Sequence, residues 1–166
     1  ENAYLRSQLE ERYRFEGIIG RSQPMRDLFQ LLETVAATSS TVLITGETGT
    51  GKELAARALH HNSPRRNNRF VALNCSAIPE TLLEAELFGH VRGAFTGAVG
   101  NRQGRLEQAH KGTLFLDEVG TMSPALQAKY LRTLQDGAVR RLGGKTELKV
   151  DVRIIAATNT EPLQAV

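Results

Sequence analysis

Apolar residues are spaced differently in the first 16 residues and in the rest of the chain. Leu5, Leu9 and Tyr13 recur every four residues among charged and amide side chains. This narrow stripe predicts a linker helix or a short coiled coil at 1–16, or equally a terminal helix that packs on nothing. The pattern then changes, and we expect a separate folded unit over 17–166.

Short β-branched and aliphatic runs alternate with amphipathic segments over the rest of the chain. The runs predict buried strands, and the segments with one apolar face predict helices. Because strands that alternate with helices usually pair in parallel, we predict an α/β fold of three αβα layers with a mostly parallel sheet. The predicted strands are 41–45, 70–74, 112–117 and 149–158, and the predicted helices are 24–36, 52–61, 79–88 and 124–135.

The segment GETGTGK, at 46–52, follows one of these strands and opens one of these helices. Its Gly and Lys spacing is that of a P-loop, in which backbone N–H groups surround a phosphate and Lys52 reaches the β- and γ-phosphates. A Gly-rich turn without a ligand is the simpler alternative. A Ser or Thr that binds Mg²⁺ usually follows the Lys, but Glu53 stands here, so another residue must hold the metal.

Polar residues end the other predicted strands. Asp117 and Glu118 follow an apolar run, and Asn74 and Asn159 end two further strands. Because ligands bind at the C-terminal edge of an open parallel sheet, we expect Asp117 to hold Mg²⁺ and Glu118 to polarise the water that attacks the γ-phosphate. Asn159 could orient that water. Without the P-loop upstream, solvated carboxylates and turn-forming asparagines would be the simpler interpretation.

Composition narrows the class of protein. The 166 residues suffice for one domain, and the net charge of +3, from 21 basic and 18 acidic residues, is too small to indicate nucleic-acid binding. Cys75 is the only cysteine, which fits a reducing compartment. No apolar run approaches the roughly 18 residues that span a bilayer, and the charged N-terminus lacks the core of a signal peptide. We therefore expect a cytoplasmic protein without a membrane partner.

The segment GAFTGA, at 93–98, surrounds one aromatic side chain with small residues. Gly93 and Gly97 permit a sharp turn, Phe95 offers an apolar contact, and Thr96 offers a hydroxyl. These residues by themselves favour a tight turn whose Phe side chain is tucked into the core. A finger that presents Phe95 to a partner is the alternative.

Six segments occur in the order found in one protein family. They are GETGTGKE, NCSAIP, ELFGHVRGAFTGA, GTLFLDEV, LRTLQDGAVRRLGG and RIIAATN. Over about residues 15–162 the chain resembles the central domain of NtrC-like sigma-54-dependent transcriptional activators, the bacterial enhancer-binding proteins, which are AAA+ P-loop NTPases. GAFTGA is close to diagnostic for this branch, whereas a P-loop alone is not. Glu53 departs from P-loops in general but conforms to this branch.

The resemblance implies an ATPase with ATP and Mg²⁺ as cofactors. In the family, the domain forms rings, hexamers or heptamers, with ATP between neighbouring subunits. Asn74 resembles a switch residue that pairs with Glu118, Asn159 resembles sensor I, and segment 18–20 resembles one that lines the adenine pocket. The residues implied as catalytic are Lys52, Asn74, Glu118 and Asn159. Those implied to bind nucleotide are Ile19, Gly46, Glu47, Thr48, Gly49, Thr50, Gly51, Lys52, Glu53, Asp117 and Glu118, of which Asp117 binds the metal.

The family also implies a role for GAFTGA. There, the loop contacts the sigma-54 factor of RNA polymerase and remodels the closed promoter complex, and the RRLGG segment at 140–144 resembles a second loop that moves with it. An alternative is a nucleotide-gated oligomerisation module of a regulator that does not act through sigma-54, and the intact GAFTGA motif favours the first function. The residues implied to contact the partner are Gly93, Ala94, Phe95, Thr96, Gly97 and Ala98.

The family's arginine fingers, fifth strand and helical lid would follow Val166, and its DNA-binding and sensory or two-component domains would lie outside this chain. We therefore expect weak ATP binding and negligible turnover from the chain alone, because an arginine finger is worth ~10³–10⁵ in rate. We also expect an open sheet edge beside the P-loop strand, where the fifth strand belongs.

Overall fold

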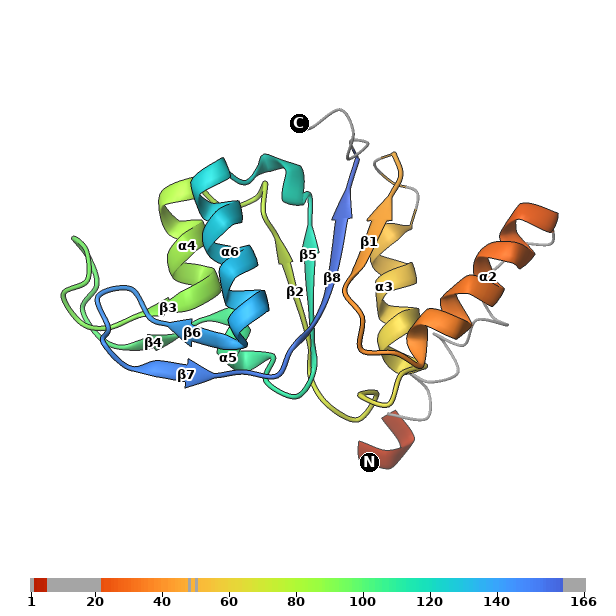
Figure 1. Cartoon of the computed structure of the whole chain (residues 1–166), viewed down its shortest axis with the longest axis horizontal. Helices are drawn as coiled ribbons and strands as arrows, with labels where there is room; N and C mark the ends of the chain where they lie inside the picture. Colours follow the sequence, from red (N-terminus) through yellow and green to blue (C-terminus); the bar gives the residue numbers. More distant parts are fainter. Residues whose placement is uncertain (1, 6–21, 48, 50, 160–166) are drawn as a thin grey trace.

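Four parallel strands form the central sheet, in the order β1-β8-β5-β2 (Figure 1). The structure is a computed structural model that describes residues 2–5, 22–47, 49 and 51–159. Helices lie on both sides of the sheet, so the predicted α/β class with a parallel sheet is confirmed. The strands of this sheet are β1 (Val42–Thr45), β2 (Phe70–Asn74), β5 (Thr113–Asp117) and β8 (Arg153–Thr158).

Alternate residues of the central strands belong to two separate cores on opposite faces of the sheet. Leu114 and Leu116 of β5 lie in one core with Ile154 of β8, whereas Phe115 and Ile155 lie in the other. This division follows from the two-residue repeat of a strand. A strand that is buried on both faces needs an apolar residue at every position, which explains the uniformly apolar runs in the sequence.

Two pairs of helices complete these cores and give the three layers that the sequence predicts. Leu83 and Leu87 of α4 pack in the first core with Leu126 of α6. Leu32 of α2 and Leu59 of α3 pack in the second core. The helices are α2 (Gln23–Ala36), α3 (Lys52–His61), α4 (Glu80–Phe88) and α6 (Pro124–Asp136).

The last predicted strand, 149–158, is wrong over its first four residues. Lys149 ends a different strand, β7 (Glu147–Lys149), which pairs antiparallel with β6 (Ala138–Arg140). β8 begins only at Arg153. The alternating part of the sequence pattern therefore belongs to a hairpin with one exposed face, and the uniformly apolar part belongs to the central sheet.

Four further elements are too short to leave a periodic signal in the sequence. β3 and β4 pair antiparallel with each other. Residues 2–5 are helical, and the rest of the helix predicted at 1–16 lies outside the described residues. Within the described ranges, no helix has the length and apolar character needed to cross a membrane. The short elements are β3 (Gly89–His90), β4 (Arg102–Gln103), α5 (Arg105–Gln108) and the 3-10 helix η2 (Val119–Thr121).

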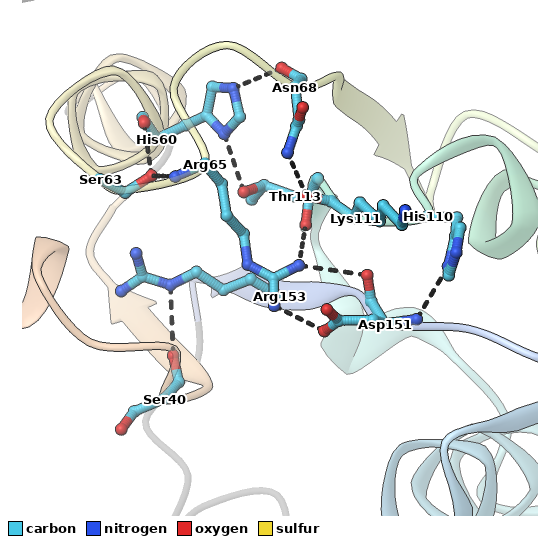
Figure 2. A network of polar contacts seen from close by, with 11 residues as sticks. Ser40, His60, Ser63, Arg65, Asn68, His110, Lys111, Thr113, Asp151 and Arg153 are labelled. Carbon is cyan, nitrogen blue, oxygen red and sulfur yellow. Dashed lines mark hydrogen bonds and ion pairs between the residues drawn. The ribbon is translucent and has the colours of Figure 1, made fainter.

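A polar network closes the N-terminal end of the sheet (Figure 2). The hydroxyl of Thr113 lies 2.8 Å from His60 Nδ1, and His60 Nε2 lies 3.0 Å from the carbonyl oxygen of Asn68. Because a carbonyl oxygen can only accept, Nε2 carries the proton and Nδ1 accepts from the hydroxyl. Arg65 extends the network through an ion pair of 2.6 Å with Asp151. The buried imidazole of His60 is therefore fully hydrogen-bonded as a neutral ring.

The burial of His60 predicts a loss of stability in mildly acidic solution. Burial lowers the pKa of His60 from 6.5 to about 4, so the unfolded chain takes up the proton first. The stabilising contribution is complete above pH 6.5 and is lost as the pH falls toward 4. Between pH 7 and pH 5, the free energy of unfolding should fall by about 1–2 kcal/mol. Urea denaturation measures this fall, and a His60→Gln variant with the same pH dependence would contradict the assignment.

Arg153, the first residue of β8, links α2 to the sheet through hydrogen bonds. It is 1% exposed, and its guanidinium donates to the carbonyl oxygens of Val35 at 2.7 Å and Ala36 at 3.2 Å. A third bond of 3.4 Å reaches the carbonyl oxygen of Ser40. The last carbonyl groups of a helix lack partners within the helix and carry partial negative charge. Burial lowers the pKa of Arg153, but an arginine stays charged, so the end of α2 supplies the compensating dipole.

Candidate functional site

The described residues among those expected to bind nucleotide lie at or next to the C-terminal edge of the sheet. The parallel register places Thr45 beside Thr158 and Asn74 beside Asp117. The N–H of Gly46 donates to the carbonyl oxygen of Thr158 at 3.2 Å, so the P-loop starts next to the end of β8. The strand order thus brings the ends of all four strands, from β1 to β2, to one edge.

The P-loop joins β1 to α3 through left-handed backbone at two glycines. Gly49 and Gly51 both have a φ of 84°. A Cβ atom at either position would meet no atom within 4 Å, so the backbone conformation, and not lack of space, requires glycine here. Lys52 Nζ donates to the carbonyl oxygens of Gly46 at 2.5 Å and Glu47 at 3.3 Å, which keeps the ammonium at the loop. Thr48 and Thr50 lie outside the described residues.

Glu53, which stands where most P-loops have a hydroxyl residue, makes an ion pair of 3.0 Å with Arg57, one turn further along α3. The guanidinium of Arg57 also lies 4.7 Å from the ring centroid of Phe70. The carboxylate of Glu53 is therefore engaged on the surface of α3. The carboxylate that the sequence offers as a metal ligand is instead Asp117, at the end of β5.

Asp117 has the features of such a ligand. Its Oδ1 atom is buried and has no hydrogen-bond partner among the described residues. Buried polar atoms are normally paired, and Mg²⁺ prefers oxygen donors and keeps several waters, so this oxygen fits a magnesium site. The described part of the chain contains no cluster of three or more His, Cys, Asp or Glu side chains. A single carboxylate fits a Mg²⁺ ion whose other ligands are phosphate oxygens and waters.

Glu118 has a left-handed backbone, with φ of 56° and ψ of 48°, which is uncommon for a residue other than glycine. Thr121 stabilises this turn, because its N–H and its hydroxyl both donate to the Glu118 carbonyl oxygen, at 3.2 and 2.8 Å. Residues held in such conformations are concentrated at functional sites. The sequence motif identifies Glu118, but nothing in it indicates this turn.

Cys75 adjoins the two carboxylates and was not recognised from the sequence as part of the site. Its N–H donates to the carbonyl oxygen of Asp117 at 3.0 Å. Burial, followed by the negative charges of Asp117 and Glu118, raises the pKa of Cys75 to about 12. The thiol is therefore neutral near pH 7, and its role here is packing.

The two asparagines lie at the same edge with different surroundings. Asn74 Oδ1 accepts from the N–H and the hydroxyl of Ser76, at 2.9 and 2.8 Å. Within the described residues these bonds go to Ser76 and not to Glu118, so the pairing implied by the resemblance is not formed in this conformation. Asn159 is exposed at the end of β8. The expected adenine-binding residue Ile19 lies outside the described residues.

An apolar groove lies beside the P-loop, along the outer edge of β1. It has a volume of about 420 Å³ and is lined by α2, β1 and α3, including Leu28, Leu31 and Leu43. These three side chains are exposed. β1 pairs with β8 on one side, and among the described residues no strand pairs with its other side. The open edge that we expected is therefore present in the described part of the sheet.

The GAFTGA segment projects from the domain as a loop between β3 and β4 (Figure 1). Gly93 and Gly97 have left-handed φ angles of 81° and 98°. The N–H of Gly93 donates to the carbonyl oxygen of Ala98 at 2.9 Å, which closes the base of the loop. Phe95 is 37% exposed. The tight turn with Phe95 in the core, which the residues alone favour, is therefore wrong.

The RRLGG loop lies beside the GAFTGA loop. The N–H of Leu142 donates to the carbonyl oxygen of Gly89 at 2.9 Å, and the N–H of Val91 donates to that of Leu142 at 3.0 Å. Arg141 makes two hydrogen bonds of 2.8 Å with Glu107 of α5, and this pairing raises the pKa of Arg141. The two loops therefore share backbone hydrogen bonds at their bases, and a large movement of one requires an adjustment of the other.

Residues 18–166 match the family model described as the sigma-54 interaction domain. The chain is 55% identical over 159 residues to the nitrogen fixation protein VnfA of Azotobacter vinelandii, covering 96% of the chain and 30% of VnfA. It is 58% identical over 149 residues to the anaerobic nitric oxide reductase transcription regulator NorR of Klebsiella pneumoniae, covering 90% of the chain and 29% of NorR.

A solved structure of NtrX from Brucella abortus in complex with ATP has a similar fold, with a TM-score of 0.79 and 43% identity. The match covers 89% of the chain and 31% of NtrX. The chain thus spans less than a third of the length of these three relatives. Its parallel sheet, its P-loop and its match to the family model lead to one conclusion: the chain belongs to the sigma-54 interaction domain family of AAA+ P-loop NTPases.

Proposed function

We propose that the chain is the ATP-hydrolysing part of a sigma-54-dependent transcriptional activator, which acts as a ring and uses the GAFTGA loop to remodel the closed complex of sigma-54 RNA polymerase. Family membership and the ATP complex of NtrX support this class of function. The observation that carries the proposal is that the chain connects the nucleotide edge directly to the GAFTGA loop. β2 ends at Asn74 on the nucleotide edge, and α4 leads from there to β3 and the loop.

At the nucleotide edge, the N–H groups of the P-loop and Lys52 would hold the phosphates of ATP. Asp117 would hold Mg²⁺, which neutralises phosphate charge when it is bound. Glu118 would polarise the attacking water, and Asn159 would orient it. Asn74 would exchange its present hydrogen bonds for a pairing with Glu118 that depends on the γ-phosphate.

α4 would transmit this exchange to the loop. Leu83, Leu87 and Phe88 of α4 are buried in the core, so the helix moves as a body and not by bending its own backbone. Its end runs directly into β3, where His90 pairs with Arg102 of β4. A shift of α4 at the nucleotide edge would therefore displace both strands from which the GAFTGA loop emerges.

The remaining functions would belong to the assembly and to other parts of the regulator. Ring formation, as a hexamer or heptamer, would place ATP between neighbouring copies. Because the chain spans only 30% of VnfA, DNA contact and sensory input would come from segments outside it. A polymerase partner also implies that the regulator works in the bacterial cytoplasm.

Phe95→Ala and Thr96→Ala should separate hydrolysis from activation in a full-length regulator that carries this chain. Neither side chain lies at the nucleotide edge, so ATP hydrolysis should stay within about twofold of the unchanged regulator. Both side chains would be central to the contact with sigma-54, so transcription from a sigma-54 promoter should fall by about 30-fold or more. Phosphate release and open-complex formation, measured on the same preparations, provide the two readouts.

Val99→Ala is the matched control. Val99 lies in the same loop, is 88% exposed and stands outside the GAFTGA motif, so its truncation should change neither readout. Activation that survived both Phe95→Ala and Thr96→Ala would favour the nucleotide-gated oligomerisation module instead.

A further inference from the structure

The side chain of Phe95 lies against the imidazole of His90, near the base of its own loop. The ring centroids are 5.0 Å apart and the ring planes meet at 75°, which is an edge-to-face arrangement. Phe95 is 37% exposed, so its side chain is partly covered and partly open to solvent. A groove of about 360 Å³ adjoins this pair and is lined also by Ile78, Leu82 and Arg102.

The two rings differ in how firmly the backbone holds them. His90 belongs to β3, where it pairs with Arg102 of β4, and a bridge joins it to Leu142 of the RRLGG loop. Backbone contacts from two segments therefore anchor His90. Phe95, in contrast, stands between the two left-handed glycines of its motif, where rotation of the backbone meets little steric resistance. The backbone of the imidazole is thus held by strand pairing, whereas the backbone on either side of the phenyl ring is held only by turn hydrogen bonds within the loop.

The imidazole of His90 also has an unfavourable feature. His90 Nδ1 is buried and has no hydrogen-bond partner among the described residues. A buried polar atom without a partner has lost its hydration and gained nothing in return. Aromatic packing favours the contact between the rings, whereas the imidazole carries the cost of a buried nitrogen, which a phenyl ring would not carry.

We propose that His90 is a positioning residue that docks Phe95 on its own domain, and that Phe95 must leave His90 before it can contact sigma-54. The last step rests on the proposed function, whereas the docking is a property of this chain alone. A His90→Phe ring would make the same kind of contact without a buried unpaired nitrogen, so it should hold Phe95 more firmly. His90→Ala removes the supporting ring and should release Phe95.

Tryptophan fluorescence can measure the docking without any partner protein. The chain contains no tryptophan, so Phe95→Trp introduces a single emitter at the tip of the loop. Adding His90→Ala should raise the acrylamide quenching constant of this indole by about twofold, and adding His90→Phe should lower it. Val99→Ala is the control in the same loop and should leave it unchanged. Equal quenching with His, Ala and Phe at position 90 would overturn the proposal.

Binding to sigma-54 tests the consequence in a full-length regulator with Phe95 unchanged. With a non-hydrolysable ATP analogue, His90→Ala should strengthen this binding by about threefold and His90→Phe should weaken it by about threefold, at unchanged affinity for the analogue. A general folding defect would move both variants in the same direction, and that outcome overturns the proposal. If quenching responds as expected but no form of the regulator binds sigma-54, the docking is upheld and the proposed function fails.

Discussion

Replacing Glu118 with glutamine should abolish ATP hydrolysis and leave ATP binding intact in a full-length regulator that carries this chain. Glutamine keeps the size of the side chain, and Thr121 can still hold the turn because it bonds the main-chain carbonyl of residue 118. A neutral amide cannot polarise the attacking water as a carboxylate does, so the rate should fall by about 10²–10⁴-fold. Steady-state phosphate release measures hydrolysis, and titration with a fluorescent ATP analogue measures binding.

Glu147→Gln is the control for the loss of one carboxylate. Glu147 lies on β7 with its side chain 67% exposed, in a surface ion pair of 3.6 Å with Arg140. Exposed ion pairs contribute little, so this variant should hydrolyse ATP at an unchanged rate. A Glu118→Gln regulator that kept more than about one-tenth of the hydrolysis rate would contradict the role assigned to Glu118.

Replacing Arg153 with methionine should produce a large loss of stability. Methionine keeps the apolar stem but cannot donate hydrogen bonds to the carbonyl oxygens of Val35, Ala36 and Ser40. The carbonyl oxygens of Ala36 and Ser40 would lose this donor, whereas that of Val35 still accepts from the N–H and the hydroxyl of Thr38. The free energy of unfolding should therefore fall by about 2–4 kcal/mol. Urea denaturation measures this loss, and amide hydrogen exchange should rise more in α2 than in β5.

Arg132→Met provides the comparison at an exposed site. Arg132 lies on the exposed face of α6, where substitutions usually change stability by no more than about 0.5 kcal/mol. A loss below about 1 kcal/mol for Arg153→Met would mean that water or other groups replace the guanidinium, and that α2 is held by apolar packing alone.

Local patterns were sufficient for the main elements and for the nucleotide edge. α3 begins at Lys52 and ends at His61, as predicted. The preceding P-loop, the amphipathic face of the helix and its length are all encoded by residues that are close together in the sequence. Asp117 could be placed at the ligand edge from its position after an apolar run, since parallel strands all end at the same edge. The roles proposed for Asp117 and Glu118 came from this placement together with the family resemblance.

Contacts between distant segments decided the features that the patterns missed. Lys149 fits a sheet strand or a hairpin equally well, and only its pairing with Ala138 assigns it to β7. A charged residue such as Arg153 is usually exposed. Here it is buried, and its guanidinium donates to carbonyl oxygens more than a hundred positions earlier in the chain. The exposure of Phe95 and its contact with His90 likewise depend on where β3 packs.

The sequence by itself thus determined the α/β class, the parallel sheet and the residues gathered at its C-terminal edge. The tertiary structure alone decided the left-handed turn at Glu118 and the position of Phe95 on the surface. It also decided that Asp117 Oδ1 is buried without a partner among the residues that the structure describes. The reason is physical. Spacing along the chain reports which backbone conformation a segment prefers, whereas the partner and the solvation of a side chain depend on which elements pack against it.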